Sequence, residues 1–207
     1  QIPLIVRKDK GEMFTGAYVK DPQVGLHKWI VSFDLNSLYP HLIMQYNISP
    51  ETIRGMHRTV PTVDKMLSKE FDTSFLKNET ITPNGAIFDN TFCGFVPELL
   101  KEMYDNRKKT KKLMLKAQQE YENTKDPQLL NTISRLKNKQ MAFKIALNSA
   151  YGAMGNQYFR FYDIRIAEAV TYGGQLSIRW IEVALNKYMN DLLETEDAVS
   201  YTHLRAH

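Results

Sequence analysis

Two long helical segments joined by a short polar link constrain the fold of this chain more than any other feature of its sequence. Pro97 stands where proline is favoured, in a first helical turn, and the helical pattern continues from there to about Asn123. Asp126-Pro127 interrupts the pattern, which resumes directly afterwards. Because so short a link makes consecutive helices turn back on one another, the sequence predicts an antiparallel helical hairpin over residues 97–156.

Positive charge is concentrated on this predicted hairpin. The whole chain of 207 residues has a formal net charge of +4, whereas the stretch from Lys101 to Lys144 holds twelve Lys or Arg against five Asp or Glu. The net positive charge of the hairpin therefore exceeds that of the whole chain, and such a basic surface suits a polyanionic partner.

A third long helix is predicted from about Ile164 to Leu193. Its apolar residues recur at helical spacing and indicate a face that packs on the core: Ile166, Ala169, Val170, Leu176, Trp180, Val183 and Tyr188. The Gly173-Gly174 pair inside this helix would allow close packing or a kink, and no chemistry is assigned to it.

The region before the hairpin mixes strand and turn patterns with one short helix. Residues 28–35 read as an apolar strand that reaches Asp34, and a short helix is predicted from after Ser37 to about Asn47. Residues 52–96 are irregular with strand-like patches. The predicted fold class is therefore α+β.

Cysteine content and hydropathy restrict the compartment. The single cysteine, Cys93, excludes an internal disulfide framework and favours a reducing environment, and its apolar neighbours suggest a small core residue. The sequence shows no run of 18 apolar residues and no signal peptide, so we expect a cytoplasmic protein without a membrane partner. The start without Met suggests an interior piece of a longer protein.

Two sets of side chains on the hairpin fall on helical faces. Arg107 and Lys111 are four residues apart, and Lys144, Asn148 and Tyr151 follow an i, i+4, i+7 spacing. Two cations facing a Lys-Asn-Tyr stripe would suit a phosphate chain with an attached ring or sugar. A solvated basic face is the alternative, and spacing alone leaves both open.

Two interpretations of the Asp34 carboxylate are also open. A carboxylate at the end of a strand can hold a divalent ion, and it can equally cap the next helix. Asn36 or Ser37 could provide that cap, which would leave Asp34 available for a metal.

Two longer motifs carry a family resemblance. The segment DLNSLYP at 34–40 resembles the DxxSLYP pattern of the B-family DNA polymerases, and KIALNSAYG at 144–152 resembles their KxxxNSxYG pattern. The basic stretch 107–111 resembles their fingers helix, and GNQYFRFYD after the second motif resembles the replicative polymerases of tailed phages. The resemblance covers about residues 11–199.

This resemblance implies template-directed DNA synthesis, in which dNMP is added from dNTP to a primer 3′-hydroxyl by two-metal phosphoryl transfer. Asp34 would be the catalytic carboxylate that binds two Mg²⁺ ions, with the backbone carbonyl of Leu35 as a further ligand. Backbone N–H groups of Ser37 and Leu38 would contact the triphosphate. Tyr39 would lie under the deoxyribose and exclude a 2′-hydroxyl by its bulk.

The second motif and the basic helix would complete the nucleotide site. Arg107, Lys111 and Lys144 would hold the β- and γ-phosphates, and Asn148 would join them. Tyr151 and Gly152 would pack near the nascent base pair.

The resemblance also implies a division of the chain. Residues 1–96 would form part of a palm with a mixed or antiparallel sheet, 97–156 the fingers hairpin, and 157–199 a returning palm helix. The family's DTD motif is not found, because residues 201–207 stand in its place. We therefore expect 200–207 to be a truncated or foreign tail and the isolated chain to be inactive or nearly so.

Primer–template DNA and dNTPs are the implied partners, with a sliding clamp as a further partner of the parent protein. For a viral chain, the implied location is the cytoplasm of an infected bacterial host. The alternative function is a non-catalytic helical module that binds nucleic acid or nucleotides without turnover.

Overall fold

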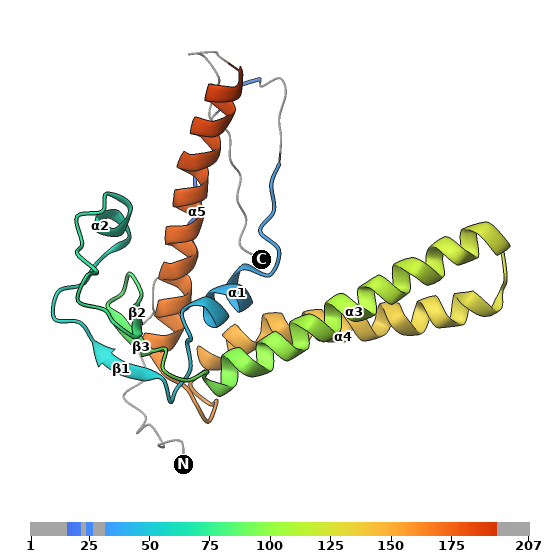
Figure 1. Cartoon of the computed structure of the whole chain (residues 1–207), viewed down its shortest axis with the longest axis horizontal. Coiled ribbons are helices and arrows are strands. Elements are labelled where there is room, and N and C mark those ends of the chain that lie inside the picture. Colours follow the sequence, from blue (N-terminus) through green and yellow to red (C-terminus); the bar gives the residue numbers. More distant parts are fainter. Residues whose placement is uncertain (1–15, 22–23, 27–31, 194–207) are drawn as a thin grey trace.

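The computed structural model describes residues 16–21, 24–26 and 32–193 of the chain (Figure 1). Helices and strands are mixed as the sequence predicts, and the fold is α+β. The elements are α1 (Leu38–Gln45), β1 (Ile53–Met56), α2 (Val63–Leu67), β2 (Glu79–Ile81), β3 (Ala86–Asp89), α3 (Phe95–Thr124), α4 (Gln128–Met154) and α5 (Ile164–Leu193).

Helices α3 and α4 form the predicted hairpin and project from the rest of the molecule as a long arm (Figure 1). Lys125 ends α3 in a left-handed conformation, with φ of 55°, and its N–H bonds the Tyr121 carbonyl at 2.8 Å. The Asp126 carboxylate then accepts a bond from the Gln128 N–H at 2.9 Å, which satisfies an N–H group at the start of α4. The turn is thus closed by local bonds, as the sequence indicates.

The sheet is small and antiparallel, with strand order β1-β3-β2. Asp89 ends the central strand, and its carboxylate accepts a bond from the Thr91 N–H at 2.8 Å and pairs with Arg54. The bond from Thr91, together with Arg54, lowers the pKa of the Asp89 carboxyl.

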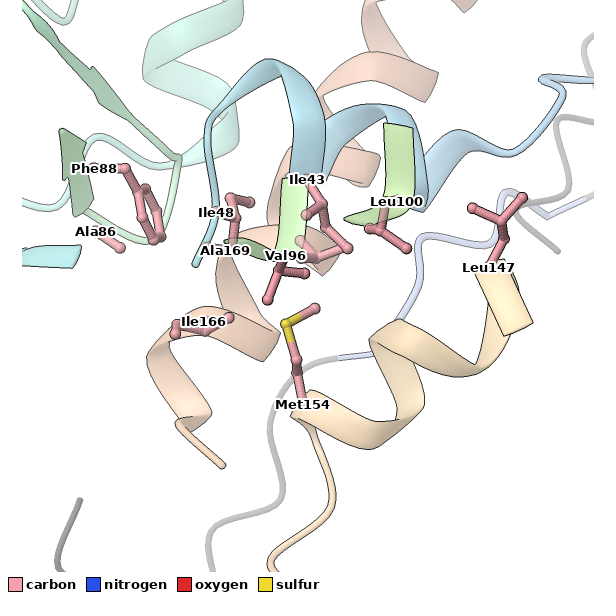
Figure 2. Close-up of a cluster of buried hydrophobic side chains, with 11 residues drawn as sticks. Ile43, Ile48, Ala86, Phe88, Val96, Leu100, Leu147, Met154, Ile166 and Ala169 are labelled. Carbon is pink, nitrogen blue, oxygen red and sulfur yellow. The ribbon is translucent and has the colours of Figure 1, made fainter. Parts of the chain in front are cut away.

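One buried cluster joins five elements around the base of the arm (Figure 2). Its members come from α1, β3, α3, α4 and α5 and from the loop after α1: Ile43, Ile48, Ala86, Phe88, Val96, Leu100, Leu147, Met154, Ile166, Ala169 and Val170. Because both arm helices contribute to it, hydrophobic burial fixes the base of the arm against α1 and α5.

The start of α3 is anchored by the segment that follows α1. Asn47 adopts a left-handed backbone, and its Nδ2 donates to the carbonyls of Asp89 at 2.6 Å and Phe92 at 2.8 Å. The Gly94 N–H donates to Asn47 Oδ1 at 2.8 Å. An added Cβ at Gly94 would lie 2.6 Å from Ser49 Cβ, so this close approach needs glycine.

The next two residues are held by the same segment. The N–H of Phe95 donates to the Glu51 carboxylate at 2.5 Å, and the N–H of Val96 donates to Ser49 Oγ at 3.4 Å. Side chains from residues 47–51 therefore satisfy N–H groups that a helix start leaves unpaired.

Three sequence-based expectations are wrong or only partly right. Residues 32–35 form no regular strand, and residues 28–31 of the predicted strand lie outside the described residues. Cys93 is exposed rather than buried, because it lies in the turn that precedes α3. On α5 the first turns are buried as predicted, but Trp180 and Val183 are 62% and 67% exposed.

Tyr188 is likewise 62% exposed, since the second half of α5 extends past α1 and α2 in the described part of the molecule (Figure 1). The predicted atypical tail, residues 200–207, lies outside the described residues. Among the helices that the structure describes, none has the length and hydropathy needed to cross a bilayer.

Candidate active site

The candidate site begins where the irregular segment 32–37 enters α1. Ser37 caps this helix in a left-handed conformation, with φ of 55° and ψ of 47°. Its hydroxyl makes no capping bond, and its carbonyl accepts from the His41 N–H at 3.1 Å. The hydroxyl instead lies 3.2 Å from the Asn36 side-chain oxygen.

Arg107 on α3 reaches this helix start. Its Nη1 lies 3.5 Å from Ser37 Oγ, a long hydrogen bond. The Nε of Arg107 is buried and has no hydrogen-bond partner among the described residues. A guanidinium with donors to spare therefore lies beside the first turn of α1, where N–H groups also favour an anion.

Tyr39 on α1 packs against Tyr151 on α4. Their ring centroids are 4.7 Å apart, and the ring planes meet at 50°. Burial raises the pKa of Tyr39, and burial together with the neighbouring Tyr39 raises the pKa of Tyr151 to about 12. Both hydroxyls are neutral at physiological pH and can donate hydrogen bonds.

Asp34 lies on the same segment, three residues before Ser37, and its side chain is exposed. The following Leu35 packs on the buried cluster of Leu38, Leu42 and Ile178, which fixes the chain next to the carboxylate. No group of three or more His, Cys, Asp or Glu side chains gathers in the described residues. The described residues therefore form no ready-made cluster of metal ligands around Asp34, and metal binding by Asp34 and the Leu35 carbonyl stays a prediction.

The other predicted residues lie on the surface of the arm. Lys111 is exposed one turn beyond Arg107 on α3, and Lys144 and Asn148 are exposed on α4 before Tyr151. An added Cβ at Gly152 would meet no atom within 4 Å, so the helix surface is open there. The positions of these residues follow from helical spacing alone, whereas Arg107 and Tyr151 also contact residues at the start of α1.

A comparison with protein-family models decides the family. The model for DNA polymerase family B matches residues 2–206. The chain belongs to this family. The sequence-based assignment is therefore confirmed at the level of the family, while the role of each site residue stays a prediction.

Individual relatives of this family B chain are also DNA polymerases. It is 33% identical over 224 residues to the DNA-directed DNA polymerase of Escherichia phage RB69, covering 88% of this chain and 25% of the relative. The corresponding enzyme of Enterobacteria phage T4 is 31% identical over 227 residues, covering 90% and 25%. DNA polymerase 1 of Pyrococcus abyssi is 34% identical over 165 residues, covering 79% and 18%. The chain thus spans about a quarter of the length of its phage relatives.

One residue at the site of this family B chain was not assigned a role from the sequence. Gly174 on α5 lies so close to the Tyr39 ring that an added Cβ would be 2.9 Å from Tyr39 Cε1. A glycine in the middle of a helix was the available signal, but periodicity does not show which side chain approaches it.

Proposed function

We propose that this chain forms the nucleotide-binding surface of a DNA-directed DNA polymerase, which adds dNMP from dNTP to a primer 3′-hydroxyl. The observation that carries the proposal is the meeting of α1, α3 and α4, where Arg107 reaches Ser37 and Tyr39 packs on Tyr151. Membership of DNA polymerase family B supports it.

The triphosphate would lie between the arm and the start of α1. Arg107 offers a forked set of donors, and Lys111 and Lys144 add point charges on the two facing helices. Ser37 is the N-cap of α1 and Leu38 is its first residue, and their N–H groups would donate to phosphate oxygens. Asn148, one turn from Lys144, would add a neutral donor.

The sugar and base would lie against the aromatic pair. Tyr39 presents a ring that is held in place by its contact with Tyr151, and a rigid ring can exclude a 2′-hydroxyl by its bulk. Tyr151 and the open turn at Gly152 would flank the new base pair.

Asp34 and the carbonyl of Leu35 would hold Mg²⁺, with two ions in the complete enzyme. Bound Mg²⁺ would neutralise phosphate charge and lower the pKa of the primer 3′-hydroxyl. Around it, the protein cations position the triphosphate, and the exposed position of Asp34 leaves room for phosphate and primer.

In this proposal the arm is the fingers and the remainder belongs to the palm. The basic arm would also contact primer–template DNA through phosphates. A sliding clamp as a partner and a cytoplasmic location of the parent protein stay predictions.

Primer extension tests the proposal in a chimera of the phage RB69 polymerase, in which residues 11–199 of this chain replace the matching segment and the RB69 sequence continues from there. We expect dNTP incorporation, and its loss in the Asp34→Ala chimera. A chimera that folds, binds DNA and incorporates nothing would favour the non-catalytic binding module instead. The isolated chain should give no extension with Mg²⁺ and dNTPs.

Nucleotide binding can be measured on the isolated chain with a fluorescent dATP analogue. Replacing Arg107, Lys111 and Lys144 by Gln should raise Kd at least about tenfold. Replacing Lys108, Lys109 and Lys112 by Gln removes the same charge from other positions of α3 and serves as the control. Equal losses in both triple variants would indicate only non-specific attraction to the basic arm.

A further inference from the structure

Gly174 lies where α5 passes close to the Tyr39 ring of α1. A Cβ built on Gly174 would stand 2.9 Å from Cε1 and 3.7 Å from Cδ1 of Tyr39, and 3.8 Å from Cδ1 of Leu42. The first of these distances is shorter than carbon atoms tolerate without one of them moving. The Tyr39 ring therefore occupies space that any other residue at position 174 would fill.

The neighbouring Gly173 provides a contrast within the same helix turn. A Cβ there would lie 3.6 Å from Cε2 of Tyr46 and 3.9 Å from the methyl carbons of Leu42, which are ordinary contacts. Glycine is unfavourable in a helix interior, so both positions run against local preference. Only at Gly174 does a specific side chain account for the glycine.

The Tyr39 ring has little freedom to yield to such a methyl group. It contacts the Tyr151 ring at a centroid distance of 4.7 Å and packs on both buried clusters. The α1 backbone that carries it is fixed by Leu42 and Ile43, which are 3% and 0% exposed. A methyl group at position 174 would thus have to push the ring away from α5 against these contacts.

We propose that Gly174 is a positioning residue that sets the depth of the Tyr39 ring and, through it, the space left for the nucleotide sugar. This inference rests on the proposed function of Tyr39. Because α5 fills one side of the ring, the sugar must approach from another side. A ring pushed off α5 would therefore crowd the sugar and leave the phosphate contacts of Arg107 unchanged.

The geometric part can be tested on the chain itself by NMR with ¹³C-labelled tyrosine, with signals assigned from Tyr39→Phe and Tyr151→Phe variants. Gly174→Ala should shift the ring signals of both tyrosines, whereas Gly173→Ala should leave them in place. Unmoved signals of Tyr39 in a folded Gly174→Ala protein would overturn the inference, whatever the protein's function.

Folding itself provides a second test of the contact. Gly174→Ala in the parent chain is compared with the same substitution in the Tyr39→Ala background. If Gly174→Ala lowers the unfolding temperature of the parent chain or prevents its folding, it should cause no such loss in the Tyr39→Ala background, where the ring is absent. An equal loss from Gly174→Ala in both backgrounds would contradict the contact, since no ring is left in the Tyr39→Ala background for the methyl group to strike.

The functional part is measured as kcat and KM for dNTP and rNTP in the phage RB69 chimera. Gly174→Ala should raise KM for dNTP about tenfold with a smaller change in kcat, and discrimination against rNTP should rise. In the Tyr39→Ala background the same substitution should change neither. Equal effects in both backgrounds would overturn the inference.

These outcomes separate the inference from the proposed function. If the Tyr39→Ala chimera discriminates sugars as well as the parent chimera, the proposed role of Tyr39 is wrong. If Tyr39→Ala loses discrimination and Gly174→Ala alters neither KM nor the sugar ratio, the role of Tyr39 stands and the role of Gly174 fails.

Discussion

The ring of Tyr39 on α1 lies 4.7 Å, centroid to centroid, from the ring of Tyr151 on α4. This contact joins the start of a short, buried helix to the long arm. Residues from two distant parts of the chain thus form one aromatic surface, and its stiffness follows from packing on both sides. The properties of this surface can be tested through each ring.

Removing the Tyr39 ring should admit ribonucleotides. In the phage RB69 chimera, Tyr39→Ala should lower discrimination against rNTP at least about tenfold, because a steric barrier to the 2′-hydroxyl is lost. Tyr39→Phe retains the ring and should retain discrimination. Single-nucleotide incorporation with dNTP and rNTP measures the ratio, and an unchanged ratio for Tyr39→Ala would show that another group excludes the hydroxyl.

Arg107 should strengthen nucleotide binding at the cost of folding stability. Its Nε is buried and unpartnered among the described residues, so Arg107→Met removes a costly buried donor while it keeps a similar length. We expect the unfolding temperature to stay equal or rise, while Kd for the fluorescent dATP analogue rises at least about tenfold. Lys108→Met, on an exposed position, is the control for both measurements. A clear fall in stability for Arg107→Met would refute this trade-off.

Tyr151 should make stability depend on alkaline pH. Burial and the neighbouring Tyr39 raise its pKa from 10.0 to about 12, so the folded protein keeps a proton that the unfolded chain releases. Its contribution to the free energy of unfolding is complete below pH 10 and is lost as pH rises through about 12. Partial exposure of the Tyr151 side chain reduces the effect through solvent screening.

Urea unfolding at pH 9 and at pH 11 checks this dependence. Tyr151→Phe should lose less stability between these values than the parent chain. Tyr158→Phe alters an exposed ring and leaves Tyr151 in place, so it should behave like the parent chain. Identical losses in the parent chain and in Tyr151→Phe would show that this hydroxyl is not the source.

Asn47 should be required for the stability of the arm's base. Asn47→Ala removes three hydrogen bonds and places alanine at a φ of 54°, which asparagine tolerates better. We expect a loss of about 2–4 kcal/mol in the free energy of unfolding. The matched control is Asn90→Ala at an exposed position, with an expected change within about 0.5 kcal/mol. Urea titrations followed by circular dichroism measure both, and equal losses would rule out a special role for Asn47.

The hairpin was predictable from sequence because its signals are local. Pro97 and Asp126-Pro127 act on their own turns, and the structure places the helix limits within a few residues of the prediction. The contact of Arg107 with Ser37 was not predictable from spacing, since it depends on how α3 packs on α1. Only the family resemblance placed these two residues in one site.

Periodicity identified apolar residues along α5 but not what covers them. Ile166 is buried because the sheet and the arm's base surround it, whereas Trp180 lies on a part of the helix beyond these elements. The apolar pattern of 28–35 suggested a strand, but a strand also needs a partner, and among the described residues none of β1, β2 and β3 pairs with 32–35. Close packing at the Gly173-Gly174 pair was one of the two alternatives drawn from the sequence, but the side chain that approaches Gly174 was not predictable, because it lies on α1.

The anchoring of α3 has a mechanical consequence. The N–H groups of Gly94, Phe95 and Val96 are held by Asn47, Glu51 and Ser49, which directly follow α1. The base of the arm is therefore bonded directly to the segment that follows α1. A rotation of the arm about its base would therefore have to break these bonds or turn the end of α1, the helix that carries Tyr39.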